Sequence, residues 1–167
     1  MNKFEPMNTN DTDKADYECH LEQVTELLGK EYNEALQLCR IIREGIRLNI
    51  PLQRIKNYTD WYYNSRLALH LKKESEYIFP ILGDDHELIK KALTKQRRLK
   101  RLFEENEQIE KSLNRIEEEL ERLIRINEKG ILNEVKKCAT LEQLIQIEKV
   151  YHKNRITEEW NDVFWHN

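Results

Sequence analysis

Hydrophobic residues recur along most of the chain at intervals of three, four or seven, which is the spacing of one helix face. Between residues 16 and 50 these positions are Leu28, Ala35, Cys39, Ile42 and Ile46. No long segment alternates between hydrophobic and polar residues, as a half-buried β-strand would. The pattern therefore predicts an all-α protein whose first helix covers about 16–50.

Proline and glycine divide the rest of the chain into further helices. Pro51 suits the first turn of a helix, where its missing N–H has no partner to lose. Pro80 is expected to end that second helix at the residue before it. Gly83 opens a turn whose two following aspartates can cap a third helix over about 85–105. A fourth helix is expected over about 107–135.

These segments divide the chain into three parts. Residues 1–15 are polar and without periodicity, which predicts a flexible arm. Residues 16–137 hold the four long helices, whose short links favour an antiparallel up-down-up-down four-helix bundle. Residues 138–167 form a helical appendage that packs on the bundle. The aromatic side chains expected to cover one end of it are Trp160, Phe164 and Trp165.

The composition agrees with a helical bundle whose outer faces carry many charges. Of the 167 residues, 35% are charged and 39% hydrophobic, with only four glycines and three prolines. The net charge of −3 gives no overall attraction to nucleic acid or to an anionic membrane. No apolar run approaches the ~20 residues that span a bilayer, and the first residues lack the apolar stretch of a signal peptide. We therefore expect a cytoplasmic protein that binds neither membrane nor nucleic acid.

One basic segment could suggest nucleic-acid binding. The run over 90–101 is the densest positive patch of the chain, and it is followed at once by the strongly acidic run over 104–121. A nucleic-acid interface needs a basic face with little acidic cover. Pairing between the two neighbouring helices is the simpler interpretation.

The residues that carry candidate chemistry are His70 and Glu74, which lie four positions apart on the expected second helix. That spacing projects both side chains from one face, and a histidine with a carboxylate is half of a metal site. The same pair is also an ordinary helix pair worth roughly 0.2–0.5 kcal/mol. Because no Ser-His-Asp or Cys-His arrangement, phosphate loop or nucleotide fingerprint occurs, we expect a protein that is not an enzyme.

Several segments together resemble the hemerythrin-like, or HHE cation-binding, family. They are REGIRLNIPLQRIKNYTDWYY, LHLKKESEYIFPILGDDHELIKKAL, RRLKRLFEE and LERLIRINEKGILNEV. Their order and spacing hold over about residues 28–165 without large gaps. The resemblance implies a four-helix bundle whose inward histidines and carboxylates hold two iron ions, which bind dioxygen or related small molecules.

At the positions where that family carries its iron ligands, this chain keeps few of them. His70 and Glu74 match the pattern of the family. The first-helix segment in which the family has an Asp and one or more His is EYNE here, over residues 31–34. Similar proteins often have a His one turn before the retained pair, where this chain has Arg66.

The third and fourth helices depart from the family as well. The third-helix His falls on Gln96, and the fourth-helix His and first carboxylate fall on Leu123 and Asn127. Neutral amides are weak ligands for iron, and a leucine cannot coordinate. We expect Arg66, or an arginine from a facing helix, to pair with Glu74 in place of the lost metal. Gln96 and Asn127 would complete a hydrogen-bonded polar core.

Two functions are consistent with these observations. The first is a hemerythrin-like protein with an eroded di-iron site, in which His70 and Glu74 are remnant metal positions. It would bind no cofactor and act as a non-enzymatic binding or structural module, a monomer or homodimer with an unknown protein partner or small ligand. The alternative is a divergent member that binds iron or another divalent cation and senses or stores metal or a small gas. It would use His70, Glu74 and Glu34 for a single ion, with His20 or His86 as an optional further donor.

Overall fold

The computed structural model describes residues 9–153 and 159–166, and every regular element within them is a helix. No strand occurs among these residues, so the prediction of an all-α fold is confirmed. In the same part of the chain, no helix combines the length and the apolar character needed to cross a lipid bilayer.

The first helix begins earlier than the hydrophobic stripe predicts. α1 spans Thr9–Arg47. The prediction of a flexible arm over 1–15 is therefore wrong for residues 9–15, and residues 1–8 lie outside the described part of the chain. Asp11 in the first turn favours the helix, because its carboxylate lies at the positive end of the helix dipole.

Contacts with the C-terminal part of the chain hold this early portion of α1. The Tyr17 hydroxyl donates a 2.7 Å hydrogen bond to the Ala139 carbonyl. His20 forms an ion pair with Glu148. These partners lie far away in the sequence, so a local hydrophobic pattern does not reveal that the helix extends this far.

The second run of helix changes its winding twice. Its elements are α2 (Leu52–Tyr62), η1 (Tyr63–Leu67), α3 (Ala68–Lys73), η2 (Glu74–Ile78) and α4 (Phe79–Leu82). The two η elements are π-helical, so each N–H bonds to the carbonyl five residues earlier instead of four. The wider turns change which side chains share a face across them.

Pro80 does not end this run, contrary to the prediction. It lies in the first turn of α4, directly after a π-helical turn, where a missing N–H is tolerated. The helix ends at Gly83, whose φ of 87° is a conformation that glycine adopts without strain.

α5 spans Glu87–Glu104. His86 caps its first turn, because its Nδ1 accepts a 3.1 Å hydrogen bond from the backbone N–H of Leu88. This role had been expected of the two preceding aspartates. Near the other end of α5, the amino group of Lys56, a residue only 2% exposed, donates a 3.1 Å hydrogen bond to the carbonyl of Phe103.

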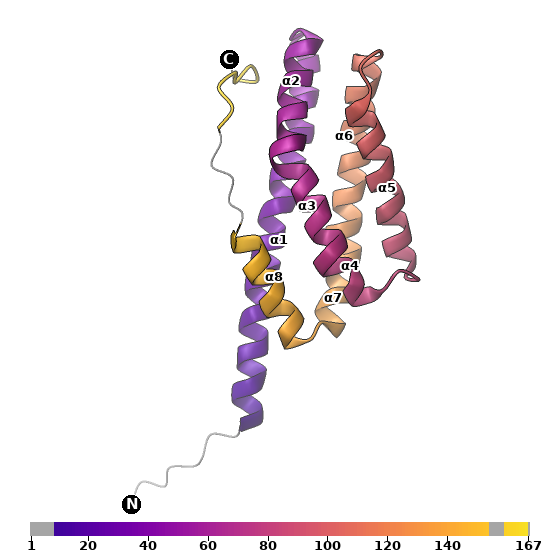
Figure 1. The fold of residues 1–167 in the computed structure, drawn as a ribbon. Coiled ribbons are helices and arrows are strands. Elements are labelled where there is room, and N and C mark those ends of the chain that lie inside the picture. Colours follow the sequence, from indigo (N-terminus) through magenta and orange to yellow (C-terminus); the bar gives the residue numbers. More distant parts are fainter. Residues whose placement is uncertain (1–8, 154–158, 167) are drawn as a thin grey trace, which may run out of the picture.

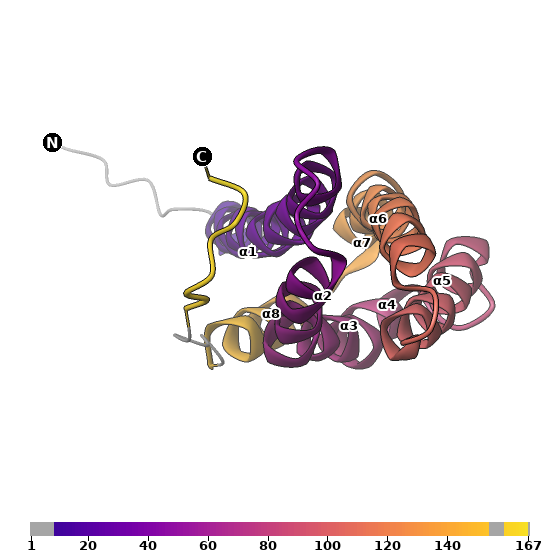
Figure 2. The same ribbon diagram turned by 90° about the horizontal axis from the view of Figure 1, so that it is seen from above.

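The remaining elements are α6 (Ile109–Arg125), the π-helical η3 (Ile126–Ile131), α7 (Leu132–Cys138) and α8 (Leu141–Lys153). In Figure 1, α1 rises, the run from α2 to α4 descends, α5 rises, and the run from α6 to α7 descends. α8 then turns back along α1. Seen from above in Figure 2, α8 lies on the opposite side of the molecule from α5.

The C-terminal aromatic residues cover one end of the fold, as predicted. Trp160, Phe164 and Trp165 pack around Tyr58 of α2, with ring centroids 5.9, 6.1 and 4.7 Å from its ring. Phe164 is the most deeply buried of the three, at 6% exposed. The chain after α8 therefore contributes to the core at this end.

Two glycines of α1 provide a matched test of this packing. A Cβ on Gly45 would lie 2.8 Å from Ile55 Cδ1 and 3.0 Å from the Phe164 ring, whereas nothing lies within 4 Å of a Cβ on Gly29. We expect Gly45→Ala to lower the free energy of unfolding by about 1–2 kcal/mol, because overpacking outweighs the gain in helix propensity. Gly29→Ala should raise it by about 0.5–1 kcal/mol. Urea denaturation measures both, and equal effects would contradict the packing described.

Candidate functional site

A carboxylate lies fully buried in the interior of the fold. Glu74 opens η2 and is 0% exposed, and His70 in the preceding turn is 4% exposed. His70 Nε2 lies 3.1 Å from Glu74 Oε1. Asn127 of η3, also 0% exposed, donates a 2.8 Å hydrogen bond from Nδ2 to Glu74 Oε2. All three side chains meet at one interior point, as their positions on the helix faces predicted.

Two tyrosines from distant parts of the chain enclose this pair. The ring of Tyr32, on α1, lies edge-on to the His70 ring with centroids 5.8 Å apart, and its phenol lies near enough to Glu74 to interact with the carboxylate. The ring of Tyr151, on α8, lies 6.1 Å from His70 in a similar geometry. We call these five residues, His70, Glu74, Asn127, Tyr32 and Tyr151, the Glu74 cluster. It joins α1, the α2–α4 run, the α6–α7 run and α8.

The cluster reaches the surface at one edge. The Glu31 side chain is 32% exposed, and its Oε2 lies 3.6 Å from His70 Nδ1. Beside it, the Lys73 amino group lies 4.9 Å from the centroid of the Tyr151 ring. Charged groups therefore lead from solvent at Glu31, through His70, to the buried Glu74.

The backbone marks the same region. Arg66 lies in η1, Glu74 opens η2, and Asn127 is the second residue of η3. π-Helical turns are rare and are frequently found at functional sites. Each of these three turns holds one of the inner polar positions picked out from the sequence. Two of the three turns, η2 and η3, supply members of the Glu74 cluster, so the winding of these helices points to the cluster independently of its side chains.

Burial and charge act on the cluster in opposite directions. Burial lowers the pKa of His70, but attraction to the Glu74 carboxylate, together with Glu31, outweighs it and holds that pKa above its ordinary value. Burial, followed by repulsion from Glu74, raises the pKa of Tyr32 and that of Tyr151 well above the ordinary value. Both tyrosines therefore stay protonated at neutral pH.

The cluster also has hydrogen-bonding capacity that its own members do not use. Asn127 Oδ1 and the Tyr151 hydroxyl are buried without a hydrogen-bond partner among the residues that the structure describes. Glu74 Oε1 and the two ring nitrogens of His70 also lack a hydrogen bond there, so His70 and Glu74 meet as an ion pair. Buried polar groups are usually paired with protein or with an ordered water. An acceptor and a donor are therefore available to a further polar group beside His70 and Glu74.

Arg66 takes a different role from the one predicted. Its Nη1 lies 4.0 Å from Glu34 Oε2, and its guanidinium lies 5.5 Å from the centroid of the Trp61 ring. Because η1 is π-helical, a spacing of four residues does not align Arg66 with His70 as it would in an α-helix. The cation that lies 3.1 Å from Glu74 is His70, so the charge compensation expected from Arg66 falls to His70.

The other expected inner positions differ in outcome. Asn127 fills the predicted amide role. Gln96 instead accepts a 3.2 Å hydrogen bond from the Ser75 hydroxyl. Leu123 is a fully buried hydrophobic residue in the core. The predicted polar core is therefore formed with one of the two amides.

The extra donors of the alternative hypothesis are engaged elsewhere. Glu34 pairs with Arg66, His86 caps α5, and His20 pairs with Glu148. Within residues 9–153 and 159–166, no group of three or more His, Cys, Asp or Glu side chains is arranged to hold a metal ion.

Tyr151 is a member of the cluster that the sequence does not predict, because it lies in the appendage expected over residues 138–167. A signal was available. Leu144, Ile147 and Tyr151 recur at spacings of three and four, which places them on one face of α8, and all three are buried. That periodicity indicates a helix that packs on the core and can contribute a side chain to its interior.

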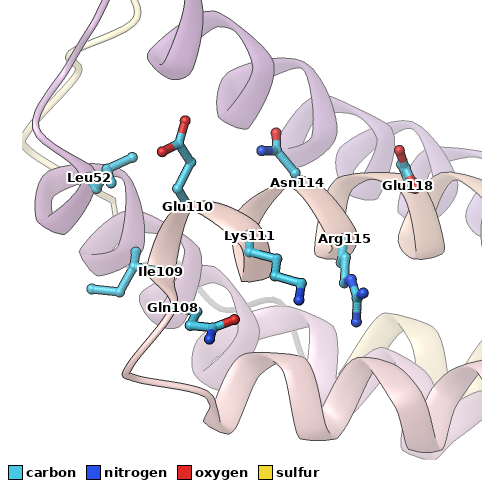
Figure 3. A pocket seen from close by; sticks show the side chains of 8 residues that line it. All are labelled: Leu52, Gln108, Ile109, Glu110, Lys111, Asn114, Arg115 and Glu118. Atoms are coloured by element: carbon cyan, nitrogen blue, oxygen red, sulfur yellow. The ribbon is translucent and has the colours of Figure 1, made fainter.

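A large surface hollow lies apart from the cluster. It has a volume of about 730 Å³ and follows α6 near the start of α2. Figure 3 shows Glu110, Asn114 and Glu118 on one side of α6, with Lys111 and Arg115 on the other. Both signs of charge line this hollow, so it favours no particular class of ligand.

Comparison with known proteins identifies no relative: no family model, no curated protein and no solved structure matches the chain. The chemistry of the site therefore follows from its own residues. The cluster can hold a compensated charge in the interior and can hydrogen-bond one further polar group.

The His70–Glu74 pair predicts how stability depends on pH. A pKa that is raised in the folded protein gives stability that is complete below the ordinary histidine value of about 6.5. This contribution is lost as the pH rises through the folded-state pKa. We therefore expect the free energy of unfolding to fall as the pH is raised above that ordinary value.

In Glu74→Gln the carboxylate is gone, so burial should lower the pKa of His70 below its ordinary value and remove the pH dependence described above. NMR titration of the His70 ring in both proteins measures this. A wild-type pKa at or below the ordinary value would contradict the geometry of the pair.

Proposed function

We propose that the chain is a hemerythrin-like protein that has lost its di-iron site and acts as a non-enzymatic binding or structural module in the cytoplasm. In this proposal α1, the α2–α4 run, α5 and the α6–α7 run form an up-down-up-down four-helix bundle, and α8 packs on it. The observation that carries the proposal is the contact set of Glu74. Its carboxylate accepts a hydrogen bond from Asn127, lies 3.1 Å from His70 and has the Tyr32 phenol nearby.

The residues around Glu74 do not fit two iron ions. A dinuclear iron site in a helical bundle is built from carboxylates and imidazoles on facing helices. Facing Glu74 are the Tyr32 phenol, which burial keeps protonated, and the Asn127 amide, a weak donor. The position that corresponds to the fourth-helix histidine is the hydrocarbon side chain of Leu123.

The same contacts support a structural role. A metal ion in such a bundle would tie several helices together through its ligands. Here a histidine, an amide and a phenol tie them together through one carboxylate. Removing one partner of a buried charge typically costs about 3–5 kcal/mol, because the remaining charge is left uncompensated. In this proposal the cluster holds four segments of the chain in register without a metal ion.

A specific observation also favours the second candidate, a single divalent cation. Asn127 Oδ1 and the Tyr151 hydroxyl are unpaired beside His70, and Glu31 stands at the open edge of the cluster. His70 and Glu74 would hold such an ion, and Glu31 would have to move toward them to complete a three-residue site. Glu31 takes the place that the sequence analysis gave to Glu34. A protein of this kind would sense or store metal or a small gas.

Metal analysis of the protein purified from iron-replete cells separates the two candidates. We expect no stoichiometric iron and no oxo-bridge absorption band, since the strong donors are too few. About two iron ions per chain, the complement of a di-iron bundle, would contradict the proposal. One ion per chain that is lost in His70→Ala would establish the second candidate instead.

Restoring the missing ligands tests the family assignment directly. In the triple variant Leu123→His, Gln96→His and Asn127→Glu, donors return to the positions that the resemblance assigns to them. We expect this variant to bind iron and to show an absorption band that the parent lacks. The same variant with Glu74→Gln added serves as the control and should lose the iron. A folded triple variant without iron would count against a hemerythrin-like bundle.

A further inference from the structure

A second, smaller hollow opens between the α2–α4 run and α5, with a volume of about 230 Å³. Ala68, Leu71 and Leu93 give it an apolar lining. Tyr63 adds an aromatic ring, which is held by stacking on Phe103 with ring centroids 4.2 Å apart. We call this hollow the α3–α5 cleft. Its apolar lining suits a short hydrocarbon or aromatic group.

The charges around the α3–α5 cleft have one sign. Lys72, Arg97 and Lys100 line it, and none of its lining residues is acidic. Among the described residues, no ion pair engages Arg97 or Lys100. Lys72 lies 3.9 Å from Glu76, and this pair is largely exposed to solvent. In a chain with a net charge of −3, this concentration of positive charge is a local property of the cleft.

Gln96 offers the cleft an unused hydrogen-bond donor. Its Oε1 lies 3.2 Å from the Ser75 hydroxyl, which also lies 3.1 Å from the Leu71 carbonyl. Its Nε2 is buried and has no acceptor within the described part of the chain. A buried N–H without an acceptor is unfavourable, and a rotation of the side chain toward the cleft would let an oxygen atom of a bound anion satisfy it.

We propose that the α3–α5 cleft binds a small organic anion. Arg97, Lys100 and the Gln96 amide hold its carboxylate or phosphate group, and the apolar lining receives a short hydrophobic body. Arg97 matters most, because its planar guanidinium can form two parallel hydrogen bonds to either acid. The volume, below the ~300–1,000 Å³ of sites for drug-sized ligands, suits a single ring or a short chain. No member of the Glu74 cluster lines the cleft, so anion binding in the cleft does not depend on whether Glu74 binds a metal ion.

Isothermal titration calorimetry on the full chain tests this inference with phenyl phosphate and benzoate, which differ in their acid group. We expect at least one of them to bind with a Kd below about 1 mM. Two control compounds each lack one of these features. Inorganic phosphate has the anionic group without a hydrophobic body, and benzyl alcohol has the ring without a charge. Both should bind at least about tenfold more weakly than the tighter of the two anions.

Variants locate the binding. Arg97→Gln and Gln96→Leu should each raise the Kd of the anion by about tenfold or more. Arg98→Gln removes the same charge from the next residue of α5, which is exposed and does not line the cleft, so it should leave affinity unchanged. Gln96→Leu should also raise the Tm of the free protein, because it removes a buried donor that has no acceptor.

Three results would overturn the proposal. They are no binding of either anion to the wild-type protein, unchanged affinity in folded Arg97→Gln, and an equal loss in Arg98→Gln. A single-stranded oligonucleotide that displaced the anion and bound more tightly through Arg97 would replace a small-molecule site with a nucleic-acid surface. Circular dichroism confirms that each variant is folded, and Arg97→Gln decides the outcome if Gln96→Leu does not fold.

Discussion

The arrangement of this protein depends on compensating one buried carboxylate. Glu74 is fully enclosed, and an isolated charge in such a place would be prohibitively unfavourable. Its partners come from three other parts of the fold: His70 from the turn before it, Asn127 from the opposite run, and Tyr32 from α1. Helices that supply these groups must keep their relative register, because a shift of one residue would leave the carboxylate without them.

Under the proposed function, this compensation would let the helical bundle keep its architecture after the loss of a metal site. A cation and its ligands can be replaced by a protonated imidazole, an amide and a phenol, provided that together they meet the charge and the lone pairs of one carboxylate. Tyr151 brings α8 into the same cluster, so the last helix belongs to the interior of the fold. The cationic α3–α5 cleft lies outside this network. The interior cluster can therefore stabilise the fold while the cleft on an outer face binds a small anion, as proposed.

Much of the fold could be predicted from local patterns. Helix periodicity identified the all-α class and the approximate limits of the main helices, and spacing correctly placed His70, Glu74 and Asn127 toward the interior. The errors have identifiable causes. Thr9 to Asp16 are helical because Tyr17 and His20 meet partners more than one hundred residues away. Arg66 turns toward Glu34 because it lies in a π-helical turn, and hydrophobic periodicity assumes an α-helical spacing.

The sequence by itself determined the main hydrophobic face of the long helices, because side-chain polarity and a fixed helical repeat are local properties. It also determined that strong metal donors are few at the inner positions. Only the tertiary structure decided how the remaining polar groups are paired. It assigned His70 as the cation beside Glu74, brought Tyr151 to the cluster, and left Gln96 with an unused donor in a basic cleft. Pairing depends on distances between helices that are remote in sequence, and small changes in winding move a side chain from one partner to another.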